Sequence, residues 1–156
     1  MGYFIGVILQ TIVLPIVSGT VELAVTGGNP VEVYGRWWVF WGVGTRLLVA
    51  GVVQLVRPET TAAILGSEMP AESELQVARE LSTANIGMGL AGLLALIPGW
   101  AAVAGVAGGV FLLIAGLLHV TKRNKNAQES LATWTDLLVG VVALVFALYA
   151  LAGILS

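Results

Sequence analysis

The chain has no cysteine, a single histidine and little charge: only 10% of its 156 residues are Asp, Glu, Lys or Arg. Without cysteine there can be no disulfide, no thiol redox chemistry and no Cys-ligated zinc or iron–sulfur site. One histidine leaves any transition-metal site dependent on carboxylates, so we expect neither a metal nor a cofactor. The net charge of −2 gives no reason to expect nucleic acid as a partner.

Catalytic signatures are also missing from the sequence. It contains no G-x-S-x-G, H-E-x-x-H or P-loop pattern, so no nucleophile, zinc pair or phosphate cradle can be assigned. We therefore predict no catalytic residue, and the sequence favours a protein that is not an enzyme.

Five apolar stretches fill most of the chain, which is 58% hydrophobic. They cover residues 3–25, 36–56, 80–97, 101–120 and 131–153. Each has about the 17–25 residues that a spanning helix needs. We predict an all-α integral membrane bundle of five transmembrane helices that forms one domain over residues 1–156. The lipid bilayer is then its first partner.

Basic residues predict the orientation of these spans. If five spans alternate, the N-terminus, the polar segment 57–79 and the loop 121–130 share one side. That side receives five basic residues, namely Arg57, Arg79, Lys122, Arg123 and Lys125, whereas only Arg36 lies near the other side. Because basic loops stay in the cytoplasm, we place the N-terminus inside and the C-terminus outside a prokaryotic plasma membrane.

The connections between the spans carry turn signals. Pro58 and Gly66 suit the start and end of a short helix on the inner surface, and Pro70 precedes a second helical start. Pro98 and Gly99 predict a tight outer hairpin, so the third and fourth spans should be antiparallel neighbours.

Small and polar residues recur at helical spacing in every predicted span. Two readings remain open, because such residues allow close helix packing and can also line a site inside the bundle. The stripes are Thr11, Pro15, Ser18 and Glu22; Gly42, Arg46, Ala50 and Gln54; Glu80, Ala84, Gly87, Ala91 and Ala95; Gly105, Gly109, Gly116 and His119; and Thr133, Asp136, Gly140, Ala143 and Ala147.

Arg46 is the hardest of these residues to explain. It lies near the middle of its span, where an arginine costs about 2.5–3.5 kcal/mol or more unless it is paired or meets water. It cannot lose its charge, so we predict that it faces protein or a polar cavity. The candidate partners are Glu22, Glu80 and Asp136, of which Asp136 is nearest by helical rise. A structural ion pair and a functional charge are equally open.

A second polar group is predicted at the inner ends of the spans. Gln54, Glu80, Asn85, His119 and Asp136 all fall in the inner half of the bundle or at its edge. Because the hairpin fixes the register of spans three and four, we expect Glu80, Asn85 and His119 to meet, with a Glu80–His119 hydrogen bond. The constellation suggests a polar cavity that opens to the cytoplasm and has Arg46 at its deepest point.

Several short motifs resemble a family of small, functionally uncharacterised bacterial and archaeal multi-pass membrane proteins. The motifs are Trp37-Trp38, Gln54, Arg57-Pro58, Ala62-Ala63, Leu65-Gly66, Glu80, Ala84-Asn85, Gly89, Gly92, Gly116 and His119. Ser67 departs from that pattern, because the family often has an aromatic residue after Leu65-Gly66. The resemblance implies no activity, but it marks Glu80, Asn85 and His119 as the positions to test.

Three functions compete at this stage. The first is transport or permeation of a proton or a small anion through the polar region around Arg46, Asn85 and Asp136, helped by homo-oligomerisation. The second is a membrane-embedded binding or accessory protein for a lipid or a partner subunit. The third, the weakest, is an enzyme that modifies a lipid or quinone, with Glu80 and His119 as acid and base.

Overall fold

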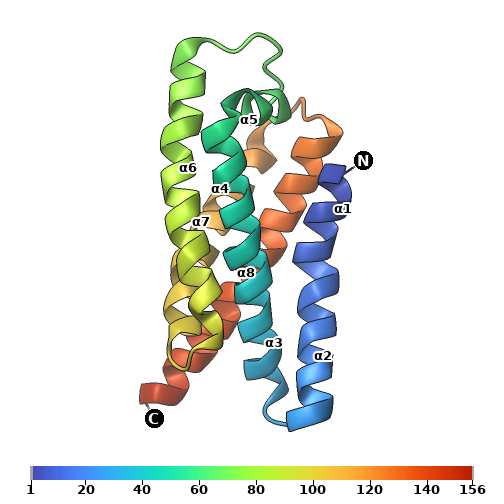
Figure 1. Ribbon diagram of the computed structural model, residues 1–156, viewed down its shortest axis with the longest axis vertical. Helices are drawn as coiled ribbons and strands as arrows, with labels where there is room; N and C mark the ends of the chain where they lie inside the picture. The colour runs from blue at the N-terminus through green and yellow to red at the C-terminus, as the bar shows by residue number, and fades with distance from the viewer. Residues whose placement is uncertain (1, 156) are drawn as a thin grey trace.

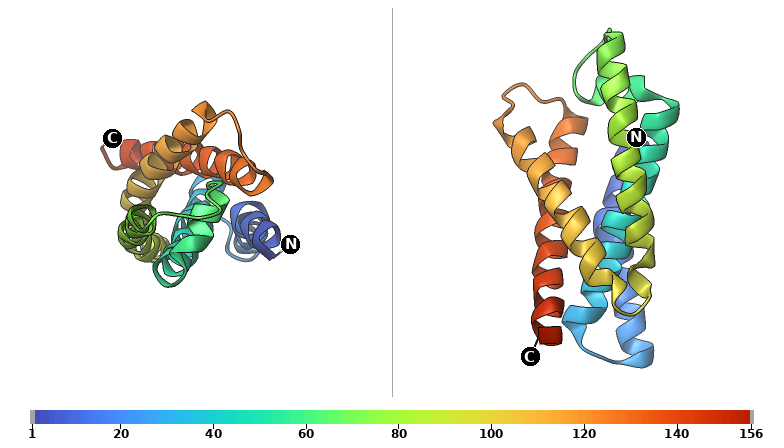
Figure 2. Two further views of the ribbon diagram at one scale, coloured as in Figure 1. Left: turned by 90° about the horizontal axis from the view of Figure 1, so that it is seen from above. Right: turned by 90° about the vertical axis from the view of Figure 1, so that its left-hand side faces the viewer.

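The computed structural model describes residues 2–155, with side chains through residue 153, and every regular element in that range is helical. Five long helices stand side by side and alternate in direction (Figures 1 and 2). The first runs through α1 (Gly2–Ile8), η1 (Leu9–Val13) and α2 (Leu14–Thr26), and the second through α3 (Pro30–Trp38), η2 (Val39–Thr45) and α4 (Arg46–Val56). The short α5 (Pro58–Ile64) leads to α6 (Glu72–Leu93), η3 (Leu94–Leu96), α7 (Trp100–Thr121) and α8 (Ala127–Leu155).

Four of these helices are long and apolar enough to cross a membrane: Gly2–Thr26, Pro30–Val56, Trp100–Thr121 and Ala127–Gly153. The predicted stretch 80–97 lies in α6 and η3, and α6 is not among the four. It begins eight residues before that stretch, at Glu72, and its first turns are polar and exposed. Figure 1 shows this polar half of α6 rising past the neighbouring helix ends, while its apolar half packs beside α4.

The turn signals read from the sequence match the observed connections. The helix α5 begins at Pro58, and Gly66 follows its end with a φ of +89°. The helix α6 begins two residues after Pro70. Between η3 and α7, Gly99 has a φ of +85°, a left-handed conformation that other residues adopt only with strain. The predicted hairpin is therefore confirmed.

The second long helix is the centre of the bundle. It contacts the first helix, α6, α7 and α8, as the view from above in Figure 2 shows. Val39 and Val43 of η2 are fully buried and contribute to the main hydrophobic core. The other core residues are mostly alanines and leucines of η3, α7 and α8, so small side chains hold the helices close together.

Glycines set the closest approaches between helices. A Cβ on Gly92 of α6 would lie 2.4 Å from the backbone nitrogen of Gly44. A Cβ on Gly109 of α7 would lie 3.2 Å from the carbonyl oxygen of Gly140 in α8. These contacts bring the backbones together where the second long helix packs on α6 and where α7 packs on α8, the two most extensive packing seams.

The predicted small-residue stripes lie inside the bundle on four helices, whereas the stripe of the third predicted span does so only at Ala91 and Ala95. Glu80, Ala84 and Gly87 are exposed, and the face of α6 that meets the second helix carries Ser82, Asn85, Gly89 and Gly92. The predicted contact face is therefore wrong over Glu80, Ala84 and Gly87 and holds only at Ala91 and Ala95, which pack in the core. The reason is that α6 has small residues on more than one face, and only the glycines at 89 and 92 match the partner backbone.

These two faces allow a matched test of packing. Gly92→Ala should lower the free energy of unfolding by about 1–3 kcal/mol, because its methyl group would collide with the backbone of Gly44. Gly87→Ala, on the same helix, has open space and should leave stability unchanged or slightly higher. Unfolding of both variants in mixed micelles measures the difference, and equal stabilities would contradict the observed packing of α6.

Candidate functional site

Arg46 and Asp136 form an ion pair inside the bundle. The Nη2 group of Arg46, at the first residue of α4, donates hydrogen bonds to a carboxylate oxygen of Asp136 in α8 and to Oγ1 of Thr135, the latter at 3.0 Å. Arg46 is 9% exposed and Asp136 8%. The prediction that Arg46 faces protein is confirmed, and its partner is the carboxylate that helical rise placed nearest.

The ion pair does not use all the hydrogen-bond donors of Arg46. The Nη1 group of Arg46 is buried and has no hydrogen-bond partner among the described residues. Oγ1 of Thr135 accepts from the other nitrogen, Nη2, and donates its own proton to the carbonyl oxygen of Leu131 at 2.8 Å. The partly buried Tyr3 of α1 lies close enough to interact electrostatically with both charges. A buried charged group with an unpartnered donor is energetically costly in an apolar bundle. Further solvation would lower that cost, or a function would explain why the residue is retained.

A buried carboxylate lies two helical turns from this pair on α8. Glu129 is 1% exposed, and with Thr133 and Asp136 it makes a line of polar side chains on the inward face of the helix. The line covers about 10 Å of helix axis at 1.5 Å per residue. It leads from the end of the bundle that holds the loop after α7 toward its interior.

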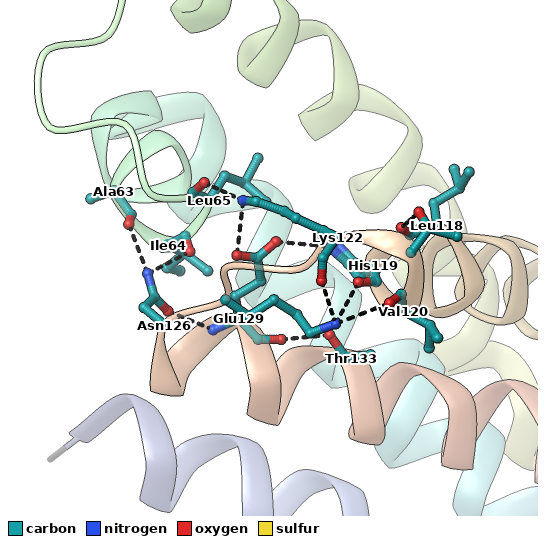
Figure 3. Close-up of polar contacts among 12 residues, drawn as sticks. Ala63, Ile64, Leu65, Leu118, His119, Val120, Lys122, Asn126, Glu129 and Thr133 are labelled. Atoms are coloured by element: carbon teal, nitrogen blue, oxygen red, sulfur yellow. Dashed lines mark hydrogen bonds and ion pairs between the residues drawn. The ribbon is translucent and has the colours of Figure 1, made fainter.

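Glu129 is held by a lysine of that loop and by a histidine in the last turn of α7 (Figure 3). Its carboxylate accepts from Nζ of Lys122 at 2.9 Å and lies 3.3 Å from Nδ1 of His119. Its backbone N–H donates to Oδ1 of Asn126 at 2.8 Å, a side-chain cap on the start of α8. Asn126 also donates to the carbonyl oxygen of Ile64, and Lys122 to that of Leu65, so the same cluster fastens the end of α5.

The predicted meeting of Glu80, Asn85 and His119 is wrong. Glu80 is exposed and accepts a hydrogen bond from Gln76, one turn earlier on α6, while His119 faces Glu129. Asn85 is buried and donates to Oε1 of Gln54 at 2.6 Å, which joins α6 to α4. Helical rise predicts only the depth of each residue, and in the structure Glu80 and His119 have different partners.

Glu22 lies in a second polar group, at the end of the bundle away from Glu129. One carboxylate oxygen accepts from Nη2 of Arg36 at 2.6 Å and the other from the indole N–H of Trp37 at 2.7 Å. Two more indoles of the second helix reach the first: Trp41 donates to Ser18, and Trp38 to the carbonyl oxygen of Thr11. A seam of polar groups therefore joins the first two helices.

Both helices of this seam contain a π-helical segment, η1 and η2. Wide turns loosen the backbone hydrogen-bond ladder and leave carbonyl oxygens available to side chains. The Thr11 carbonyl in η1 accepts the Trp38 indole in this way, and Oγ1 of Thr45 bonds the Trp41 carbonyl in η2 at 2.8 Å. Arg46 follows directly after η2.

Several residues of these groups were not found from the sequence, notably Glu129, Thr135 and Lys122. For Glu129 a signal existed: Asn126 is a good helix cap, and seven residues, or two turns, separate Glu129 from Asp136. Extending the fifth predicted span toward Asn126 would have placed both carboxylates on one face. Nothing in the sequence indicated the π-helical segments.

Two cavities lie at opposite ends of the bundle, and Arg46 lines neither. One, of about 350 Å³, lies between α5 and the start of α6, and the other, of about 710 Å³, between α3, the hairpin and the end of α8. Arg46 is only 9% exposed, and neither of these cavities is the predicted polar cavity with Arg46 at its deepest point. Within residues 2–155 the acidic side chains and the histidine do not gather into a group able to hold a metal ion.

The chain belongs to a protein family described as "Family of unknown function (DUF6790)", whose pattern matches residues 3–153. No curated protein and no solved structure matches the chain. Family membership agrees with the resemblance to uncharacterised proteins noted from the sequence motifs, and it carries no activity to this chain.

The ion pair predicts a large loss of stability when one partner is removed. Arg46→Leu leaves the Asp136 carboxylate buried without its counter-charge and should cost about 3–5 kcal/mol of unfolding free energy. Arg46→Leu combined with Asp136→Leu should recover most of that loss. Unfolding in mixed micelles measures both, with Arg79→Leu as a control, because the exposed Arg79–Glu72 pair should contribute less than about 1 kcal/mol. A double variant no more stable than the single one would contradict the pairing.

Proposed function

We propose that this protein spans a prokaryotic plasma membrane five times, with its N-terminus in the cytoplasm and its C-terminus outside. The alternating directions of the long helices support this arrangement, with α6 and η3 as the third span (Figure 1). The loop after α7 and the segment after α4, which carry most basic residues, lie at the same end of the bundle as the start of α1. The exposed apolar side chains of the first helix and α8 would then face lipid.

The topology is tested with reporters. An enzyme active only outside the cytoplasm should work when fused after Ser156, and one active only inside should work when inserted after Arg123. The reverse pattern would reject the orientation. If both fusions report the cytoplasm, the C-terminus lies on the same side as the N-terminus, and the number of spans is even.

We further propose that the polar groups inside the bundle conduct protons. The observation that carries this proposal is the line of Glu129, Thr133 and Asp136 on the inward face of α8. It leads from the end predicted to be cytoplasmic to Arg46. Carboxylates and hydroxyls can pass protons through short hydrogen-bonded steps without an open pore.

The partners of Arg46 favour a proton over a small anion as the transported species. Asp136 already neutralises the guanidinium, so an anion would have to displace a buried carboxylate. The seam of Ser18–Trp41 and Glu22–Arg36 continues the polar groups toward the opposite end. Five helices leave little room for a proton path across the membrane. A second copy of the chain or another membrane subunit would complete that path.

A binding or accessory role is the second candidate. The indole hydrogen bonds of Trp37, Trp38 and Trp41 fix the first two helices to each other, as a rigid scaffold for a lipid or a subunit requires. No observation favours an enzyme that modifies lipid or quinone, because Glu80 and His119 have separate partners.

Proton movement is tested in liposomes that carry a pH-sensitive dye. Vesicles with the wild-type protein should dissipate an imposed pH gradient faster than protein-free vesicles. Asp136→Asn removes the exchangeable carboxylate and should slow the protein-dependent rate by at least about tenfold. Thr133→Val, a smaller change, should slow it in the same direction.

The matched control is Glu59→Gln, an exposed carboxylate on α5 that should conduct like the wild type. Each variant is first checked for a cooperative unfolding transition. Wild-type vesicles no leakier than empty ones would reject the proposal. So would folded Asp136→Asn and Thr133→Val variants with wild-type rates.

A further inference from the structure

The cavity of about 710 Å³ lies far from Glu129, at the end of the bundle where α8 finishes (Figure 1). The start of the second long helix, the Pro98–Gly99 hairpin, the first turn of α7 and the last turns of α8 form its walls. Its volume falls within the range of about 300–1,000 Å³ that is typical of small-molecule sites. None of the polar groups proposed to conduct protons on α8 lines it.

The walls of this cavity are mostly apolar. Ala102, Phe146 and Ala150 line it, and the Phe146 ring is seated against Gly35 of α3. A Cβ on Gly35 would lie 2.0 Å from that ring, so only glycine there lets the ring lie against α3. The ring of Tyr149 adds a second aromatic wall. Such a surface suits the hydrocarbon part of an amphiphile.

The charges at the cavity favour a cation. Arg36 lines it, and Glu22 neutralises its guanidinium charge through Nη2 at 2.6 Å, while its buried Nε has no hydrogen-bond partner among the described residues. Glu32, in the first turn of α3, lines the same cavity and makes no hydrogen bond or ion pair with any described residue. The local balance is therefore one unpaired negative charge, beside aromatic rings whose faces attract cations.

Tyr149 supplies a further polar contact. Its hydroxyl oxygen accepts a hydrogen bond from Nδ2 of Asn29 at 2.8 Å, so its own O–H remains available to an acceptor. A ligand with an ammonium group and a neighbouring oxygen would meet both Glu32 and Tyr149.

We propose that this cavity binds an ammonium group carried on an apolar body, with Glu32 as its counter-charge. Two sources have this chemistry: the headgroup of phosphatidylethanolamine, and a soluble organic amine such as benzylammonium. The cavity binds either source whether or not the protein conducts protons, because no residue of the α8 line lines it and Arg36 is the one lining residue that it shares with the seam between the first two helices.

The lipid arm compares phosphatidylethanolamine with phosphatidylglycerol retained by the purified protein in native mass spectrometry. The soluble arm measures benzylammonium, and its uncharged analogue benzyl alcohol, by calorimetry in a non-ionic detergent. Wild type should prefer the ammonium compound in at least one arm. Binding only in the lipid arm assigns the headgroup, and binding only in the soluble arm assigns a free amine.

The key variant is Glu32→Gln, which removes the counter-charge at an exposed position and should weaken the preferred ligand by about tenfold. Ala150→Leu, which fills part of the cavity, should weaken it through the apolar wall. Glu59→Gln, an exposed carboxylate at the other end, is the matched control and should bind as wild type. Unchanged binding in a folded Glu32→Gln variant, or no ammonium preference in either arm, would overturn the proposal.

Discussion

A permanent positive charge in the middle of an apolar bundle is the constraint on which this structure depends. Arg46 cannot deprotonate, so its helix must be placed where a carboxylate can meet it. The pairing with Asp136, together with the contact of Gly42 with Val139, fixes the register of the central helix against α8. The remaining helices pack around these two through glycines and alanines, which have no directional chemistry of their own.

Polar side chains elsewhere in the bundle also find partners, although Arg36 Nε and Asn85 Oδ1 have none among the described residues. Glu129 is surrounded by groups of the loop after α7, Glu22 by Arg36 and Trp37, and Asn85 by Gln54. Each group joins two helices, or a helix and a loop, so each stabilises the fold whatever its function. The α8 line is distinguished by two buried carboxylates on one helical face, an arrangement that packing alone does not require.

Features that depend on a few neighbouring residues could be predicted from the sequence, whereas features that depend on how helices face one another could not. Apolar length, the hairpin at Gly99 and the turn at Gly66 were predictable because each depends on a few neighbouring residues. The partner of His119 could not be predicted in this way. The rise per residue gives the position of a residue along the bundle axis but not the direction in which its side chain points, and α6 turns Glu80 away from α7. The contact face of α6 was ambiguous for a similar reason, since its small residues occupy several faces.

The sequence by itself determined an all-helical, membrane-like bundle, the tight turn between α6 and α7, and the need for Arg46 to have a partner. These follow from hydrophobicity, backbone conformation and the cost of burying a charge. Only the tertiary structure decided that Asp136 is that partner, that Glu129 holds His119 and Lys122, and that the central helix widens at η2. Such features depend on how helices rotate against one another, and that rotation is set by packing across the whole bundle.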